Sequence, residues 1–363
     1  MKMNEFLIKN RHYMLSIIII QFVLFVSCQR NNMINYEVSY ERMCDIGKDK
    51  SESFCIVLYD STSFTPEDYI EKYTRLAACA DNIIVDFIEI NSGNNDWYIK
   101  MLRPDILPLT CIFDSDGILI DLIPGSSSES MKYIIRGLKL GEPAVEFHFN
   151  CLYGDNKLEK IRLFRKIFRI RNNLESGKNV QMSIDSLKED MYPYLLYLKL
   201  KNQIHLKDTT AAQETAERLL EFNSAEDLVT YEDELFYANQ FLDSDYDSLS
   251  APKIQIIPCE ISLDNCKVGE SVPVILKVTN IGHRLLKISD IITSCSCIQL
   301  QSDIENYDIY PGDSAVVGFY FIPDQEGRFH RDIFIASNSY KMPLCHVTIN
   351  ATCISSATKR KSN

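Results

Sequence analysis

Two cysteines stand one residue apart in the run Ser294-Cys295-Ser296-Cys297, and this spacing limits the chemistry open to them. On an extended strand the two side chains would share a face with Cβ atoms too far apart for an unstrained disulfide, whereas a turn would let the sulfurs bond. A metal would require further ligands, and the nearest candidates lack a zinc-ligand spacing: His283, Cys345 and His346. We therefore weigh three interpretations: structural thiols, a redox-sensitive disulfide and a metal site. Structural thiols are favoured, and no cofactor or metal is expected.

The other cysteines, of 12 in all, have less distinctive settings. Cys259 with Cys266, and Cys345 with Cys353, are two further candidate pairs that the sequence alone cannot assign. The chain is neither small nor poor in apolar residues, so a dense disulfide framework is not expected. Runs of apolar residues follow Cys55 and Cys111, and a free cysteine in such a run usually acts as a small buried hydrophobe.

Residues 53–140 alternate strand and helix signals, which predicts an α/β domain. Thr65 is a candidate helix N-cap with Pro66 at the first helical position. The expected strands are 54–59, 83–90, 109–113 and 118–123, and the expected helices are 66–79 and 128–138.

The segment 106–113 and the turn residues Asp116-Gly117 resemble the thioredoxin superfamily. In that superfamily a cis-proline precedes a central strand, so the resemblance implies a cis bond at Pro108. It also implies a reactive cysteine pair at the start of the first long helix, where backbone amides stabilise a thiolate. The loop 60–68 contains no cysteine, and Cys79 falls at the far end of the expected helix. We therefore expect a thioredoxin-like domain without thiol chemistry.

Residues 141–243 are expected to form a helical segment, because apolar residues recur every three or four positions from about 156 to 242. Helices are expected at 187–200, 209–222 and 231–241. They resemble a degenerate tetratricopeptide-type array, although no repeat of about 34 residues is legible. A basic amphipathic stretch at 157–171 can lie on anionic lipid or bury its apolar face beneath a basic rim. Burial is the favoured interpretation.

Residues 244–252 are a polar linker, after which the apolar pattern changes to a period of two. This change predicts an all-β, immunoglobulin-like (Ig-like) sandwich at 253–354, followed by a polar tail at 355–363. Its expected strands are 253–257, 272–279, 285–288, 314–322, 329–335 and 345–352.

Three motifs in this region occur in a recognisable order: Asn280-Ile281-Gly282, Ser294-Cys295-Ser296-Cys297 and Pro311-Gly312-Asp313. Together they resemble an uncharacterised family of bacterial Ig-like domains with an Asn-x-Gly turn, a Ser-Cys-Gly-Cys signature and a Pro-Gly-Asp/Glu turn. The likeness covers most of residues 253–353. Ser296 stands where that family usually has glycine, and the family supplies no established reaction.

The N-terminus is basic, then apolar from Leu15 to Val26, and closes on Phe25-Val26-Ser27-Cys28. This pattern resembles the signal of a bacterial lipoprotein, which implies cleavage of residues 1–27 and lipid attachment at Cys28. The apolar run is short for a membrane span, and an uncleaved N-terminal anchor is the alternative. Residues 28–52 are then expected to be a linker.

Composition excludes several functions. At 363 residues the chain is too long for one hydrophobic core, and its net charge of −12 argues against a nucleic-acid partner. No nucleophile elbow, phosphate-binding loop, dinucleotide fingerprint or zinc-protease helix is present.

The sequence therefore predicts a multidomain protein: an α/β thioredoxin-like domain, an α-helical middle and an all-β Ig-like sandwich. It resembles the multidomain lipoproteins of Bacteroidota. The expected function is non-catalytic binding or scaffolding in the cell envelope, facing the periplasm, with the membrane as one partner through Cys28 and an envelope protein or glycan as another. The sequence favours a non-catalytic binding protein over an enzyme, but it does not exclude an enzyme. The alternative is thiol–disulfide exchange or redox sensing by Cys295 and Cys297.

Overall fold

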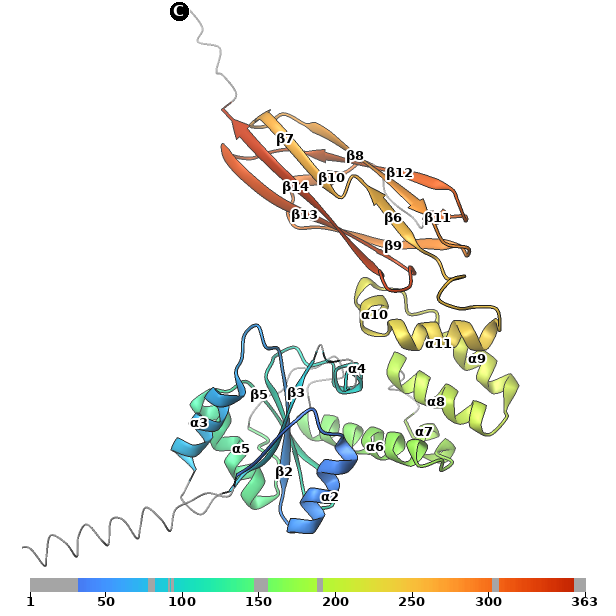
Figure 1. Cartoon of the computed structure of the whole chain (residues 1–363). Helices are drawn as coiled ribbons and strands as arrows, with labels where there is room; N and C mark the ends of the chain where they lie inside the picture. Colours follow the sequence, from blue (N-terminus) through green and yellow to red (C-terminus); the bar gives the residue numbers. More distant parts are fainter. Residues whose placement is uncertain are drawn as a thin grey trace, which may run out of the picture. The chain divides into compact units, whose positions relative to one another are not determined.

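The computed structural model describes residues 32–77, 82–90, 92, 95–146, 156–187, 192–301 and 307–355. The chain divides into two compact units, Met1–Arg169 and Ile170–Asn363. The first is drawn in blue to green and the second in green to red (Figure 1). The division falls within one helix, α6, Lys157–Glu175.

The first unit is built on a five-stranded sheet of order β1-β3-β2-β4-β5. Strands β1, β3 and β2 are parallel, whereas β4 runs antiparallel to both β2 and β5. The bounds are β1 Met33–Tyr36, β2 Phe54–Tyr59, β3 Ile84–Glu89, β4 Leu109–Phe113 and β5 Leu119–Pro124. The central strands are mainly apolar because both of their faces are covered, and Asp86 of β3 and Thr110 of β4 are buried polar exceptions.

Helices cover both faces of this sheet (Figure 1). On one face, α3 (Pro66–Leu76) and α5 (Ser128–Leu140) pack Tyr69, Tyr73 and Met131 against Cys55 and Val57 of β2. The other face carries an aromatic cluster that joins β4 to α2 (Tyr40–Lys50), α4 (Trp97–Leu102) and α6. Its rings in mutual contact are Tyr40, Trp97, Phe113 and Phe168.

The linker expected at 28–52 is replaced, over residues 33–50, by a strand and a helix of the α/β unit. Met33 to Tyr36 pair with Ile84 to Phe87, and the Asn35 amide donates to the carbonyl of Val85 at 3.2 Å. Ser39 caps α2, and the Met43 side chain of that helix is fully buried. A four-residue edge strand of mixed polarity carries too little alternation to be recognised in the sequence.

The basic helix α6 packs against the first unit through its own basic residues. The ammonium of Lys157 lies 2.8 Å from the carboxylate of Asp121 and donates to the carbonyl of Ala144 at 2.6 Å. Arg165 donates to the carbonyl of Leu119, while Phe164 is fully buried. These contacts favour the buried-face interpretation over a helix lying on lipid.

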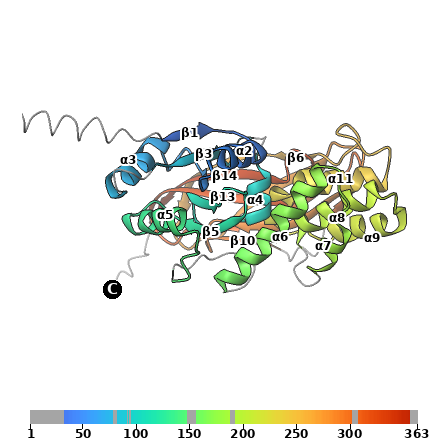
Figure 2. The same ribbon diagram turned by 90° about the horizontal axis from the view of Figure 1, so that it is seen from below.

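The second unit begins with the helical segment, as the sequence predicts. Its helices are α7 Gln181–Asp185, α8 Pro193–His205, α9 Thr209–Leu219, α10 Ala225–Thr230 and α11 Glu232–Leu242. Figure 2 shows α8, α9 and α11 side by side, and all three are in mutual contact. The helix expected from residue 187 begins at Pro193, whose ring suits a first helical position.

The C-terminal part is a two-sheet β-sandwich of Ig-like character, which confirms the predicted class. One sheet has the order β10-β12-β8-β6 and the other β11-β9-β13-β14-β7. The bounds are β6 Ile254–Ile257, β7 Glu260–Lys267, β8 Val272–Asn280, β9 Leu286–Thr293, β10 Ile298–Leu300, β11 Tyr307–Ile309, β12 Ser314–Phe321, β13 Gly327–Ser337 and β14 Leu344–Ile354. Inward side chains of both sheets form one apolar core.

The polar linker expected at 244–252 is an ordered connection. The Asp247 carboxylate accepts hydrogen bonds from the amides of Leu249 (2.9 Å) and Ser250 (2.6 Å), so local polar contacts fix the turn. The rings of Phe236 on α11 and Tyr340 after β13 stack with centroids 4.0 Å apart. The helical segment and the sandwich are therefore packed together within one unit.

A buried carboxyl makes the stability of the first unit depend on pH. Asp86 on β3 is fully buried, and burial raises its pKa to about 7 despite hydrogen bonds from the Val38 amide. Between about pH 4, the ordinary value, and pH 7 the folded state holds a proton that the unfolded state has lost. Stability is therefore expected to fall as the pH rises through this window.

Asp86→Asn should flatten that dependence and raise the free energy of unfolding by about 1–3 kcal/mol at pH 8, because it removes a buried charge and keeps an acceptor for Val38. Urea unfolding at pH 4.5, 6 and 8, monitored by an α/β-unit signal such as the fluorescence of Trp97, measures the effect. An equal pH slope in wild type and variant would contradict this assignment.

Candidate functional site: the Cys295–Cys297 turn

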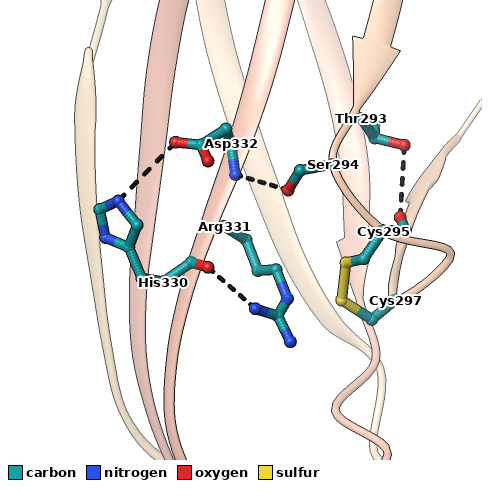
Figure 3. The surroundings of a disulfide bond; sticks show 7 residues. All are labelled: Thr293, Ser294, Cys295, Cys297, His330, Arg331 and Asp332. Atoms are coloured by element: carbon teal, nitrogen blue, oxygen red, sulfur yellow. Dashed lines mark hydrogen bonds and ion pairs between the residues drawn. A yellow bond between two sulfur atoms is a disulfide. The ribbon is translucent and has the colours of Figure 1, made fainter. Parts of the chain in front are cut away.

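The site lies where the chain leaves one sheet of the sandwich for the other. Strand β9 ends at Thr293, and β10 begins at Ile298 in the opposite sheet. The four residues between form a tight turn in which Cys295 and Cys297 are joined by a disulfide, with Cα atoms 5.2 Å apart (Figure 3). The turn brings the sulfurs within bonding reach, which an extended strand would not allow.

Backbone contacts hold this turn on both sides. Ser294 exchanges two hydrogen bonds with Asp332 of β13: its amide donates to the Asp332 carbonyl at 2.9 Å, and its hydroxyl accepts from the Asp332 amide at 2.8 Å. The carbonyl of Cys297 accepts from the Ile322 amide at 2.8 Å. The hydroxyl of Thr293 donates to the carbonyl of Cys295 at 3.3 Å. These hydrogen bonds hold the turn in addition to its disulfide.

The two sulfurs differ in exposure. Cys297 is buried in the sandwich core, Cys295 is half-buried against that core, and Ser296 between them is exposed. A reductant or thiolate would therefore meet Cys295 before Cys297, because attack on a disulfide needs access to one sulfur.

Polar residues of the second sheet lie near this turn. The Asp332 carboxylate lies close to two histidines. Its Oδ1 is 2.6 Å from Nε2 of His346 and 3.9 Å from Nε2 of His330, which Figure 3 shows. Arg331 follows the alternation of β13 onto the core face, where it packs over the Phe329 ring. Among the described residues no group of three or more His, Cys, Asp or Glu side chains is arranged to hold a metal ion.

The other candidate cysteine pairs do not form. Cys259 and Cys266 flank opposite ends of β7, and Cys345 and Cys353 occupy opposite ends of β14. Seven or eight residues of strand separate the members of each pair by roughly 23–26 Å, far beyond disulfide reach. All four are free thiols in this structure.

The first unit contains a cis peptide bond between Leu107 and Pro108, immediately before β4, but no described sulfur pair beside it. In the loop that leads to α3, the carboxylate of Asp60 accepts from the Thr62 amide at 2.8 Å. Thr65 has the extended backbone of an N-cap, but its side chain makes no capping bond. Cys28, Cys79 and Cys151 lie outside the described residues.

Thiols in this unit are deactivated by burial. Cys55 and Cys111 are fully buried on central strands, and burial raises the pKa of both thiols far above the ordinary value. Burial raises the pKa of the half-buried Cys44 thiol to about 11, opposed by a hydrogen bond from Tyr40. None of these three would be a thiolate at neutral pH.

A cavity of about 460 Å³ opens in the second unit between the helical segment and the sandwich. Its apolar wall includes Leu235, Phe236 and Tyr246, and its sandwich wall carries Lys287 and Asp308. Apolar walls with a few convergent polar groups are typical of ligand sites. The sequence analysis missed this cavity, because its lining residues come from two separate stretches of the chain, 220–246 and 287–343.

An apolar patch lies on the outer face of the β10-β12-β8-β6 sheet. Ile275 and Val316 are 60% and 62% exposed, and Ile257 and Tyr320 are also exposed. Register places Ile275 diagonal to Ile257 of β6 and to Val316 and Tyr320 of β12, and Lys277 stands between Ile257 and Val316. Contiguous exposed apolar side chains of this kind mark interaction surfaces.

Residues 254–352 match the family described as "Protein of unknown function (DUF1573)". This match covers the sandwich and includes the Cys295–Cys297 turn. No curated protein matches the chain. Among the described residues, no helix is both long and apolar enough to traverse a bilayer.

Several solved structures are similar to parts of the chain. A protein of unknown function from Porphyromonas gingivalis W83 is 18% identical, with 30% of this chain and 50% of that chain covered at a TM-score of 0.25. The ASH/PapD-like domain of human CEP192 is 12% identical over 30% of this chain and 89% of that domain, at a TM-score of 0.26. The secreted serine protease VesC from Vibrio cholerae is 17% identical over 33% of this chain and 26% of that protein, at a TM-score of 0.25.

Proposed function

We propose that this protein is a non-catalytic, periplasm-facing envelope lipoprotein that binds or scaffolds partners through a thioredoxin-like domain and an Ig-like domain. The proposed partners are the membrane, through a lipid on Cys28, and an envelope protein or glycan. The observation that carries the proposal is that the described thiols of the α/β unit are buried or half-buried with raised pKa values, and that the segment before α3 contains no cysteine.

The thioredoxin-like assignment is supported by topology. The strand order β1-β3-β2-β4-β5, with α3 after β2 and the cis bond at Pro108 before β4, agrees with the resemblance found in the sequence. In a redox-active member the helix after β2 would open with the cysteine pair. Here the corresponding segment, residues 60–66, offers hydroxyls, one aromatic ring and a proline.

Binding is supported by two surfaces of the second unit. The cavity between α10–α11 and the sandwich pairs aromatic walls with a lysine and an aspartate, a combination suited to a polar ligand with an apolar face. The outer patch around Ile275 and Val316 exposes several large apolar side chains beside Lys277, which suits a protein partner.

A second candidate function is thiol–disulfide exchange or redox sensing at Cys295 and Cys297. The observation that favours it is the disulfide itself, which lies in a turn with the half-buried Cys295 as the accessible sulfur.

An insulin-reduction assay with dithiothreitol separates these functions. We expect purified wild-type protein to precipitate insulin no faster than the buffer control, because the described thiols of the α/β unit are buried or raised in pKa. Cys297→Ser should behave identically. Reduction that Cys297→Ser abolishes would establish the second function, and reduction that survives this substitution would contradict a protein without thiol chemistry.

Lipid anchoring is tested by Cys28→Ser in the source cell or a Gram-negative host. We expect wild-type protein in the membrane fraction with residues 1–27 removed, and the variant unprocessed and without a labelled acyl chain, because the thiol is the acylation site. Labelling with an alkyne fatty acid and intact-mass measurement provide the readouts. A wild-type protein that keeps residues 1–27 and carries no acyl chain would point to the uncleaved anchor.

Partner binding is tested by site-specific photocrosslinking in living cells. A benzophenone side chain at Ile275 should give a discrete, reproducible adduct, because this exposed residue lies at the centre of the apolar patch. The matched control is Arg328, which is exposed on the opposite sheet of the same sandwich. Equal labelling at both positions, or none at Ile275, would contradict binding by this face.

A further inference from the structure

Two cysteines that the sequence analysis did not pair meet in the sandwich. Cys266 on β7 and Cys353 on β14 are direct partners in the parallel ladder between these strands. Neighbouring strands lie about 4.8 Å apart, and Cα atoms joined by a disulfide are usually about 4.4–6.8 Å apart. The backbones are thus already at bonding distance.

A β-bulge turns both side chains to the same face. Up to Leu263, paired with Ala351, the ladder is regular, and the register then shifts before Cys266 and Cys353. Two residues of β7, Asp264 and Asn265, stand opposite one residue of β14. Asn265 adopts φ of +57°, which asparagine tolerates better than most residues.

Burial along β7 shows which side chains the bulge turns toward the core. Ile261 and Leu263 are partly buried against the core, so simple alternation would turn Asn265 inward. Asn265 is instead exposed, and Cys266 takes the inward position. The bulge therefore places one sulfur, and no polar side chain, beside Cys353.

The two thiols are shielded from solvent. Cys266 and Cys353 are 6% and 3% exposed and belong to the sandwich core. Burial raises the pKa of the Cys353 thiol to about 11, and the adjacent Cys266 thiol adds to the rise.

We propose that Cys266 and Cys353 are a disulfide-forming pair that joins β7 to β14, the C-terminal strand of the sandwich. Two thiols lose two protons and two electrons to a disulfide-bonded oxidant, forming one S–S bond and releasing the oxidant as two thiols. An oxidising envelope supplies such an oxidant, and only this supply depends on the proposed location. The pairing itself depends on the fold alone.

The two disulfides would differ in effect. Cys295–Cys297 encloses a single residue, whereas Cys266–Cys353 would enclose every strand from β8 to β13. Closing a long loop removes far more entropy from the unfolded chain. The Cys266–Cys353 bond is therefore expected to raise the melting temperature of the sandwich by about 10 °C.

Peptide mapping of the full chain tests the pairing. Trypsin leaves Cys259 with Cys266 on one peptide and Cys345 with Cys353 on another, so the test uses Cys259→Ala/Cys345→Ala protein, in which each peptide keeps one cysteine. The protein is reduced, oxidised with glutathione disulfide, quenched with acid, alkylated and digested. We expect residues 254–267 joined to residues 342–359, lighter than the sum of the two by two hydrogen atoms.

Cys266→Ser provides the matched control and a stability readout. Oxidation should raise the melting temperature of wild-type protein but leave this variant nearly unchanged, because of the two sandwich pairs it keeps Cys295–Cys297 alone, which encloses a single residue. Both peptides recovered unjoined after Cys295–Cys297 has formed, or Cys266 joined to any other cysteine, would overturn the proposal. This result does not depend on insulin reduction or on the anchor at Cys28. The Cys266–Cys353 pairing and the proposed binding function can therefore be refuted independently of each other.

Discussion

Desolvation of sulfur is the physical constraint on most of the described cysteines, which are buried or half-buried. A thiol removed from water resists ionisation, and only the thiolate attacks a disulfide or binds a metal. In the α/β unit the described thiols lie on central strands or on α2, and burial raises the pKa of each of them. In the sandwich, by contrast, two pairs of cysteines meet in different settings: one in a surface turn and one in the core.

Backbone geometry determines which cysteines meet. At Cys295 and Cys297 a turn replaces the extended conformation that would hold the two sulfurs apart, and the hydrogen bonds between Ser294 and Asp332 fix that turn. At Cys266 a single inserted residue changes which side chains face the core, because side chains alternate with a period of two. Neither feature involves an unusual residue type. Both depend on register, which connects segments far apart in the sequence.

This dependence on register explains what the sequence could and could not predict. Strands β2 and β4 have the predicted bounds, since each is an apolar run closed by turn residues, and the helical segment followed from its three- and four-residue spacing. The edge strand β1 and the bulged strand β7 escaped recognition, because the first is only four residues long and the second loses its alternation at Asn265. The candidate pairs Cys259–Cys266 and Cys345–Cys353 were drawn from proximity in sequence. The fold instead places their members at opposite strand ends.

The polar composition of residues 244–252 predicts a flexible linker, but the structure has an ordered connection there. In a flexible linker the aspartate and serine side chains would face water. Here the Asp247 carboxylate accepts a hydrogen bond from the Ser250 amide, and the rings of Phe236, Tyr246 and Tyr340 pack around the turn. Because the helices and the sandwich pack together within one unit, the cavity between them takes one wall from each. The packing of aromatic rings at the connection therefore brings the apolar wall of the helical segment together with Lys287 and Asp308 of the sandwich.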